Sequence, residues 1–304
     1  MNRFVLRQSL ILFLTAVIWG LGFIAQSVGM DYVEPFTFTA SRNVLAFLVL
    51  IPYIAVADKR KQKNDTSVIN KRALWIGGIC CGVCLFAASS LQQFGVKYTT
   101  VGKAGFITAM YMVLVPIFGI FLHKKAGLKV WAAVALAALG MYLLCITKGE
   151  FRLELGDSLV FACAVCFTFH ILTIDHFSPK TDGVKLSCIQ FLVCAVLSTL
   201  SALIFEKPDL RNIAAAGVPI LYAGVFSSGV AYTLQIIGQK GMNPTVASLI
   251  LSLESVVSVL AGWLILNQAL SRREILGCIL AFAAIILVQL PDKKAHAQIT
   301  QSTE

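Results

Sequence analysis

Residues 91–97 read Leu-Gln-Gln-Phe-Gly-Val-Lys, and residues 234–240 read Leu-Gln-Ile-Ile-Gly-Gln-Lys. The same offset of 143 residues pairs Ala104 with Ala247 and Val113 with Val256 without a gap. Each copy joins two apolar segments through a short polar turn. A register that continues for about forty residues indicates a duplicated structural unit.

The composition is that of an integral membrane protein. Hydrophobic residues make up 58% of the 304-residue chain and charged residues only 13%, whereas soluble domains carry about 25% charged residues. The net charge of +10 does not indicate nucleic-acid binding, because the basic residues lie in short loops with no basic, aromatic-rich face. The nine cysteines all lie in apolar segments, so they do not form a secreted disulfide framework.

Ten apolar segments are each long enough to cross a bilayer as a helix, which needs roughly 17–25 residues. The sequence therefore predicts an all-α integral membrane protein with ten transmembrane helices. The expected spans are about 9–28, 36–57, 73–93, 102–122, 128–146, 156–175, 185–206, 217–238, 245–266 and 274–290.

The duplication divides these spans into two sets of five. Because five is odd, the second set enters the membrane from the opposite side, which predicts two inverted five-helix repeats in residues 1–148 and 149–291. Residues 292–304 are expected to be a disordered cytoplasmic tail. Inverted repeats are a common plan of secondary transporters, whose substrate site lies near the bilayer midplane where the repeats meet.

The distribution of Lys and Arg predicts the orientation. Of the 25 such residues, 16 lie on the side of the termini and 8 on the other, and Arg42 lies within a span. An excess of positive charge marks the cytoplasmic side, so both termini are expected in the cytoplasm. The expected location is the inner (plasma) membrane of a bacterium.

Local patterns then resemble a known family. They are Trp19-Gly20, Pro35-Phe36 six residues before Arg42, residues 101–108 with Tyr111 and Pro116, Ala231-Tyr232, and Leu253-Glu254. Together, over about residues 9–290, they resemble the EamA branch of the drug/metabolite transporter superfamily. Two positions depart from the family pattern: Ser255 replaces the usual Pro, and Asn267-Gln268 replace the usual Gly-Glu. The resemblance implies a secondary transporter, often an exporter, of amino acids or other small metabolites.

Two charged residues within spans are candidates for binding substrate. Glu254 lies near the middle of the ninth span, where a charge is costly and ionisable groups are usually functional. It could bind a substrate amine or carry a proton, or it could be a structural partner that locks helices together. Arg42 could bind a carboxylate or phosphate through its planar guanidinium, or it could reach the outer interface or pair with an acid.

His170 is a second candidate for proton coupling, because histidine titrates near physiological pH. With Cys163 and Cys166 it forms a set with spacing i, i+3, i+7 on one helix face. Seven residues cover about 10 Å of helix, too long for one ion, so no metal site is expected. A histidine hydrogen-bonded beside a cavity is the simpler interpretation.

Other residues could line the same cavity. Trp19, Tyr111 and Tyr232 offer stacking faces and Gln235 offers an amide, although ordinary interhelical packing also explains each of them. Pro116 should kink the fourth span and is a candidate hinge.

Three classes of function are open to a chain of this kind. The first is a secondary transporter that works by alternating access and could be coupled to protons. The second is a membrane enzyme acting on lipid or lipid-linked substrates, and the third is a scaffold or sensor. The polar residues within spans are spread between the two halves and inverted repeats favour transport, so no enzymatic activity is expected. The short loops offer little surface for protein partners, which disfavours a scaffold or sensor. The phosphate-binding GxxxxGK[ST] pattern is absent, and no cofactor is expected. The expected partners are a small-molecule substrate and the lipid bilayer, with a homodimer left open.

Overall fold

The computed structural model describes residues 3–61, 70–99, 101–122, 127–145, 155–266 and 271–290, and every regular element in these ranges is helical. Eight segments are long and apolar enough to cross a membrane. Two shorter apolar helices, Leu128–Gly140 and Ile275–Val288, lie where the fifth and tenth spans are expected. The chain is therefore an all-helical membrane protein. The expected tail at 292–304 lies outside the described residues.

The helices follow the expected spans closely. In the first half they are α1 (Arg3–Gly29), α2 (Pro35–Lys61), α3 (Lys71–Tyr98), α4 (Val101–Thr108), α5 (Tyr111–Phe121) and α6 (Leu128–Cys145). In the second half they are α7 (Leu155–Phe177), the short 3-10 helix η1 (Ser178–Lys180), α8 (Gly183–Phe205), α9 (Leu210–Ala215), α10 (Gly217–Leu221), the π-helix η2 (Tyr222–Tyr232), α11 (Thr233–Gln239), α12 (Pro244–Leu251), α13 (Leu253–Leu266) and α14 (Arg272–Gln289).

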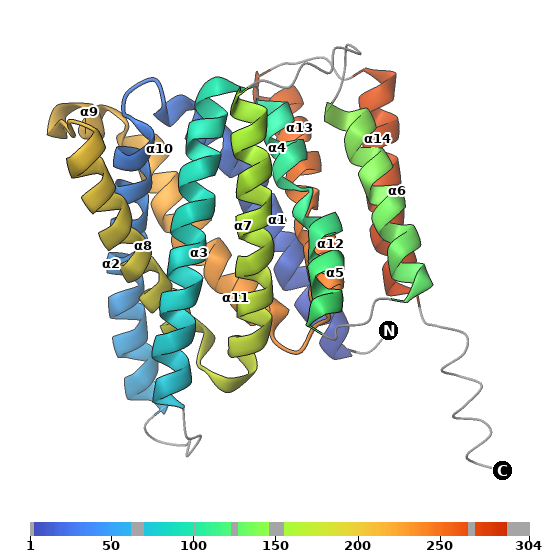
Figure 1. The fold of residues 1–304 in the computed structure, drawn as a ribbon, viewed down its shortest axis with the longest axis horizontal. Coiled ribbons are helices and arrows are strands. Elements are labelled where there is room, and N and C mark those ends of the chain that lie inside the picture. The colour runs from blue at the N-terminus through green and yellow to red at the C-terminus, as the bar shows by residue number, and fades with distance from the viewer. Residues whose placement is uncertain are drawn as a thin grey trace.

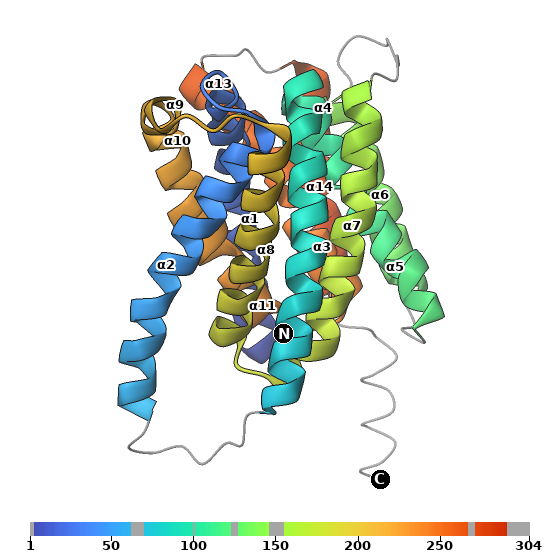
Figure 2. The same ribbon diagram turned by 60° about the vertical axis from the view of Figure 1, so that its left-hand side comes forward.

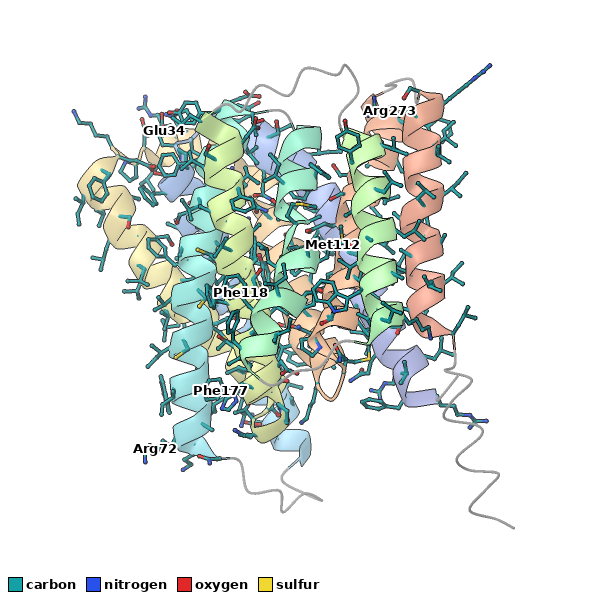
Figure 3. The ribbon with its side chains drawn as sticks, turned by 45° about the vertical axis from the view of Figure 1, so that its right-hand side comes forward. Glu34, Arg72, Met112, Phe118, Phe177 and Arg273 are labelled. Atoms are coloured by element: carbon teal, nitrogen blue, oxygen red, sulfur yellow. The ribbon has the colours of Figure 1, made fainter. Side chains whose placement is uncertain are left out.

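The helices form one bundle with two ends (Figure 1). We call the end where α1 begins and α2 ends the lower face, and the end where α1 ends and α2 begins the upper face. Charged residues gather at the ends: Glu34 and Arg273 lie at the upper face and Arg72 at the lower face (Figure 3). Between the ends, the flanks expose aliphatic side chains such as Leu200 and Ile279, as expected of a surface that lipid covers.

The fourth and ninth spans are each interrupted. The fourth breaks between α4 and α5 at Ala109 and Met110, and the ninth breaks between α12 and α13 at Ser252, 143 residues after Ala109. Tight turns mark both breaks: Met110 N donates to Ile107 O (3.1 Å) and Ser255 N to Ser252 O (3.2 Å). In both spans a new helix begins directly after the break.

The break in the fourth span does not lie at Pro116, where a kink was expected. Helix α5 continues through Pro116 to Phe121. A proline within a helix removes the one hydrogen bond that its missing N–H would have made to the carbonyl four residues earlier, and here the loss of that bond does not end the helix.

The eighth span contains an element that the sequence did not predict. Its central part is the eleven-residue π-helix η2, flanked by α10 and α11. Hydrophobic periodicity does not separate a π-helix from an α-helix over so short a stretch, and π-helical turns in proteins are frequently found at functional sites.

The helices pack in two units that exchange elements between the sequence halves. Helix α1 packs against η2, α11, α12 and α13, whereas α7 packs against α3, α4 and α5. Helices α2 and α8 pack most extensively against each other; α2 also packs against η2 of the second half, and α8 against α3 of the first. We call α3, α4, α5, α7 and α8 the first packing unit, and α1, α2, η2, α11, α12 and α13 the second packing unit.

Glycines allow the exchanged helices to approach closely. A Cβ at Gly20 of α1 would lie 2.6 Å from the carbonyl oxygen of Glu254 in α13, and one at Gly156 of α7 would lie 2.7 Å from the carbonyl carbon of Tyr98 in α3. Small residues at helix interfaces in membranes permit this kind of backbone contact. The units meet between α2 and α8 (Figure 2), between the two broken spans, between α2 and α3, and between α8 and α11.

Candidate substrate-binding site

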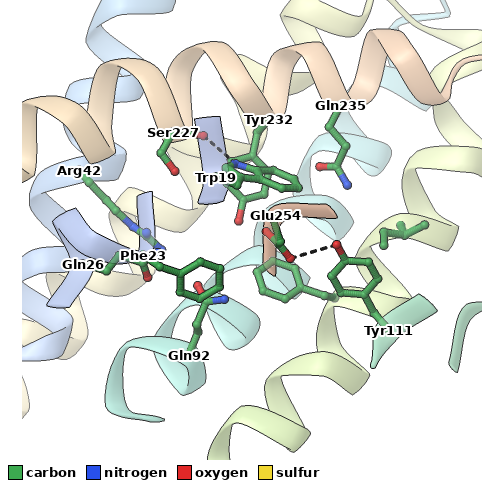
Figure 4. Close-up of a pocket in the computed structure, with 12 residues that line it drawn as sticks. Trp19, Phe23, Gln26, Arg42, Gln92, Tyr111, Ser227, Tyr232, Gln235 and Glu254 are labelled. Atoms are coloured by element: carbon green, nitrogen blue, oxygen red, sulfur yellow. Dashed lines mark hydrogen bonds between the residues drawn. The ribbon is translucent and has the colours of Figure 1, made fainter. Parts of the chain in front are cut away.

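A narrow cavity lies between the two packing units, near the breaks in the fourth and ninth spans (Figure 4). Six of the seven residues predicted for the site line it: Trp19, Arg42, Tyr111, Tyr232, Gln235 and Glu254. The structure thus brings together residues from six helices that are far apart in the sequence.

Glu254 and Tyr111 form the centre of the site. Tyr111 is the first residue of α5 and Glu254 lies in the first turn of α13, so the two breaks place both residues at the start of a helix. Tyr111 Oη donates a hydrogen bond of 3.0 Å to Glu254 Oε1. The side chains are only 3% and 4% exposed. A buried carboxyl group is favoured in its neutral form unless a cation lies beside it.

Arg42 lies on another wall of the cavity, two turns into α2. It is 3% exposed, and it forms no ion pair with any other described residue. Its Nε has no hydrogen-bond partner in the described part of the chain, and its guanidinium carbon lies 6.0 Å from the centre of the Phe38 ring. A buried cation that is not neutralised by the protein favours an anionic ligand, because burying an isolated charge is costly.

Trp19 and Tyr232 form an aromatic wall beside Glu254 (Figure 4). Their ring centres are 4.6 Å apart at an interplanar angle of 56°. Trp19 Nε1 donates a 3.0 Å hydrogen bond to the carbonyl of Ser227, inside η2. The π-helix therefore supplies both a cavity residue and the acceptor that orients Trp19.

Three glutamines add amide groups to the cavity. Gln92 Nε2 donates to Thr108 Oγ1 at 3.3 Å, which fixes its orientation. The Oε1 atoms of Gln26 and Gln235 are buried and have no partner among the described residues. Buried acceptors are rarely left unpaired, so these two oxygens are suited to accept hydrogen bonds from a ligand or from water.

His170 is the one predicted site residue that does not line the cavity. It is fully buried next to Tyr232, with 5.9 Å between ring centres, and its Nε2 lies 3.0 Å from Gln190 Oε1. Its Nδ1 has no partner in the described ranges. His170 is therefore placed to act on the cavity through its neighbours Tyr232 and Phe167.

The cavity also contains residues that the prediction of the site did not include. They are Phe23, Gln26, Gln92, Phe167, Ile171 and Ser227. The first helices of the two halves correspond at an offset of 148 rather than 143 residues, since α2 begins at Pro35 and α8 at Gly183. At this offset Phe167 corresponds to Trp19 and Ile171 to Phe23, so the repeat could have revealed them. No comparable signal marks Ser227, because its place depends on η2.

Among the described residues, no group of three His, Cys, Asp or Glu side chains is arranged to hold a metal ion. Seven cysteines are free thiols: Cys80, Cys81, Cys84, Cys163, Cys166, Cys188 and Cys194. Arg42, Glu254 and the unpaired amide oxygens are instead suited to bind a small polar molecule directly.

The bundle and its central polar cavity define a polytopic membrane transporter. The chain belongs to the EamA-like transporter family, which matches residues 7–146 and again residues 154–290. It is 29% identical over 278 residues to an uncharacterized transporter of Archaeoglobus fulgidus, covering 91% of this chain and 84% of the relative. It is 31% identical to protein PecM of Dickeya dadantii over 103 residues, about a third of each chain.

The fold also matches a protein of known crystal structure. The TM-score is 0.75 at 20% sequence identity, and the match covers 93% of this chain and 96% of the other. The arrangement of helices is thus one that occurs in experimental structures.

Proposed function

We propose that this protein is a secondary transporter that exports small metabolites such as amino acids by alternating access to the central cavity, with coupling to protons through Glu254. The observation that carries the proposal is the placement of Arg42 and Glu254 on separate walls of one buried cavity, without an ion pair between them. A substrate could place an anionic group on Arg42 and a hydrogen-bond donor on Glu254, while Trp19 and Tyr232 would cover its apolar part.

We further propose that the two halves are inverted repeats of five spans each. In support, α2 begins at the upper face with Pro35, and α8 begins at the lower face with Gly183, 148 residues later. The two separate family matches agree with this division. The proposed setting is a bacterial inner membrane with the lower face in the cytoplasm, because Lys and Arg are concentrated on the side of the termini.

The experiment is substrate exchange in proteoliposomes. Purified protein is reconstituted into liposomes, and these are loaded with one labelled amino acid at a time. The efflux of the label is compared with that from liposomes that contain no protein. We expect the protein to exchange a subset of amino acids. In a second assay, in which a proton gradient drives accumulation of the substrate, we expect both Arg42→Gln and Glu254→Gln to lose accumulation.

Matched controls are Arg211→Gln and Asp31→Asn, which change exposed charges outside the cavity. If no small metabolite exchanges in proteoliposomes, or if the cavity variants behave as the controls do, the proposed function is wrong.

A further inference from the structure

Two carboxylates tie α2 to α8 at opposite ends of the bundle. At the upper face, Glu206 follows the last residue of α8 and accepts hydrogen bonds from the backbone N–H groups of Phe36 and Thr37, both at 2.8 Å. The hydroxyl of Thr37 donates a third bond to Glu206, at 2.6 Å. At the lower face, Asp58 in the last turn of α2 forms an ion pair of 2.8 Å with Lys185 in the first turn of α8.

These two ties join equivalent positions of the two halves through different bonds. Lys185 lies 148 residues after Thr37, and Glu206 lies 148 residues after Asp58. In each case an acidic residue at the end of one helix binds the first turn of the other helix. The upper tie has its acid on α8 and the lower tie has its acid on α2, so the halves exchange roles between the two faces.

Both ties cross the seam between the packing units. The contact between α2 and α8 is the most extensive that either helix makes; beyond it, α2 packs against η2 and α8 packs against α3. The cavity lies between these units, with Arg42 of α2 on its wall. The units cannot separate at one face while the tie at that face remains bonded.

We propose that Glu206 and Asp58 control access to the cavity from the upper and lower faces, and that the two ties open in turn. This inference rests on the proposed function, because it assigns the two states of alternating access to two specific contacts. While one tie is released, the other keeps α2 and α8 together and acts as the fulcrum.

The two ties differ in strength, which makes the cycle asymmetric. Glu206 accepts three hydrogen bonds at the first turn of α2, where the helix dipole also favours a negative charge. The Asp58–Lys185 pair is partly exposed, with 47% and 28% of the side chains accessible, and exposed ion pairs contribute little. The structure therefore favours opening at the lower face when no substrate is bound.

The chain offers matched reporters of access. Thr39 in α2 lies near the upper tie, and Ser187 in α8 lies near the lower tie, 148 residues later. Both side chains are fully buried. A cysteine at either position in a Cys-less background will react with a membrane-impermeant maleimide only when its face opens.

The test compares labelling rates of Thr39→Cys and Ser187→Cys in the reconstituted full-length protein. We expect Glu206→Ala to raise the rate at position 39 about 10-fold and to lower the rate at position 187, because losing charge-assisted hydrogen bonds shifts a two-state equilibrium by about this factor. We expect Asp58→Asn to do the reverse, by about 2-fold. The double variant should return the ratio of the two rates toward that of the parent, and Asp31→Asn should change neither rate.

A rise at both positions in either variant would indicate general loosening and would overturn the proposal, as would unchanged rates. If Glu206→Ala does not fold, Glu206→Gln keeps one acceptor oxygen and should shift the rates in the same direction by a smaller factor. Labelling does not require transport, so opposite shifts without substrate exchange would reject the proposed function alone. If substrate exchange is normal but a variant changes the labelling rates at positions 39 and 187 in the same direction, only the role of the two ties is rejected.

Discussion

Tyr111 and Glu254 are 143 residues apart, which is the repeat offset, and they are hydrogen-bonded to each other at 3.0 Å. Two equivalent residues of a duplicated chain can touch only beside the axis that relates the copies. Under the proposed inverted repeat, the pair places this axis beside the cavity. It also shows that the two copies contribute a phenol and a carboxyl to equivalent places, so the site is chemically asymmetric although the backbone is duplicated.

The Tyr111–Glu254 contact should be measurable as an energetic coupling. Tyr111→Phe removes the hydroxyl and Glu254→Gln removes the charge, and each leaves the volume nearly unchanged. Because the residues are in contact, their effects on thermal unfolding in detergent should be non-additive by about 0.5–3 kcal/mol. Gln92→Leu paired with Tyr111→Phe serves as a control, since no hydrogen bond between Gln92 and Tyr111 exists in the described ranges. Additive effects at positions 111 and 254 would contradict the coupling.

Glu254→Gln should separate proton coupling from substrate binding. The amide mimics a neutral carboxyl, so the variant cannot take up and release a proton. We expect it to lose accumulation driven by an imposed pH gradient in proteoliposomes while it retains exchange of labelled for unlabelled substrate. Accumulation at the parental level would show that another group carries the proton. Loss of both activities with a lowered melting temperature would show that Glu254 holds the helices together.

Arg42 should recognise an anionic group through its guanidinium fork. Arg42→Lys keeps the charge but not the paired donors, so we expect substrate affinity to fall about 10-fold, as for the loss of one hydrogen bond to a charged group. Arg42→Gln should weaken binding further. Affinity is measured as the Kd of the exchanged substrate, with Arg211→Gln as the control. An unchanged Kd in Arg42→Gln would show that the residue is not part of the binding site.

Gly20→Ala should destabilise the protein and disturb the site. The added Cβ would lie 2.6 Å from both the Glu254 carbonyl oxygen and Val257 Cβ, so α1 and α13 must move apart. Overpacking of this kind typically costs about 1–3 kcal/mol, which should lower the melting temperature in detergent. Gly217→Ala is the matched control, because a Cβ added there would meet no described atom within 4 Å. Equal melting temperatures for the two variants would contradict the tight α1–α13 contact.

The orientation in the membrane can be tested with single cysteines in a Cys-less background. Asn212 lies exposed on α9 at the upper face, and Ser302 belongs to the C-terminal segment outside the described residues. A cysteine at 212 should react with an impermeant reagent added to intact cells, whereas one at 302 should react only after permeabilisation. The reverse pattern would place the lower face outside.

Much of the fold is predictable because apolar spans and the repeat are properties of the sequence itself. The expected span at 128–146 and the helix Leu128–Cys145 agree closely, as do 156–175 and Leu155–Phe177. The helix breaks were not predicted, because Ala109 and Ser252 are not strong helix breakers. Pro116 was the visible irregularity, yet α5 continues through it.

The site was predicted in part. Charged residues within spans pointed to Arg42 and Glu254, since such residues are costly in lipid unless they face a cavity or a partner. Trp19 was chosen for its stacking face. His170 has the same chemistry but is hydrogen-bonded to Gln190 outside the cavity lining. Which way a polar side chain faces depends on helix rotation and on neighbours from the other half, and neither is visible in a single sequence.

The exchange of helices between the packing units also constrains how the protein is made. Helix α1 is synthesised first, but its most extensive contacts are with η2, α11, α12 and α13 of the second half. The amide of its buried Gln8 donates hydrogen bonds to the carbonyls of Ile237 and Lys240, which leave the ribosome much later. The first helix must therefore wait in the insertion machinery or in lipid without these partners. A nascent chain that stops after the first repeat would expose unsatisfied polar groups, which makes it a natural target for quality control.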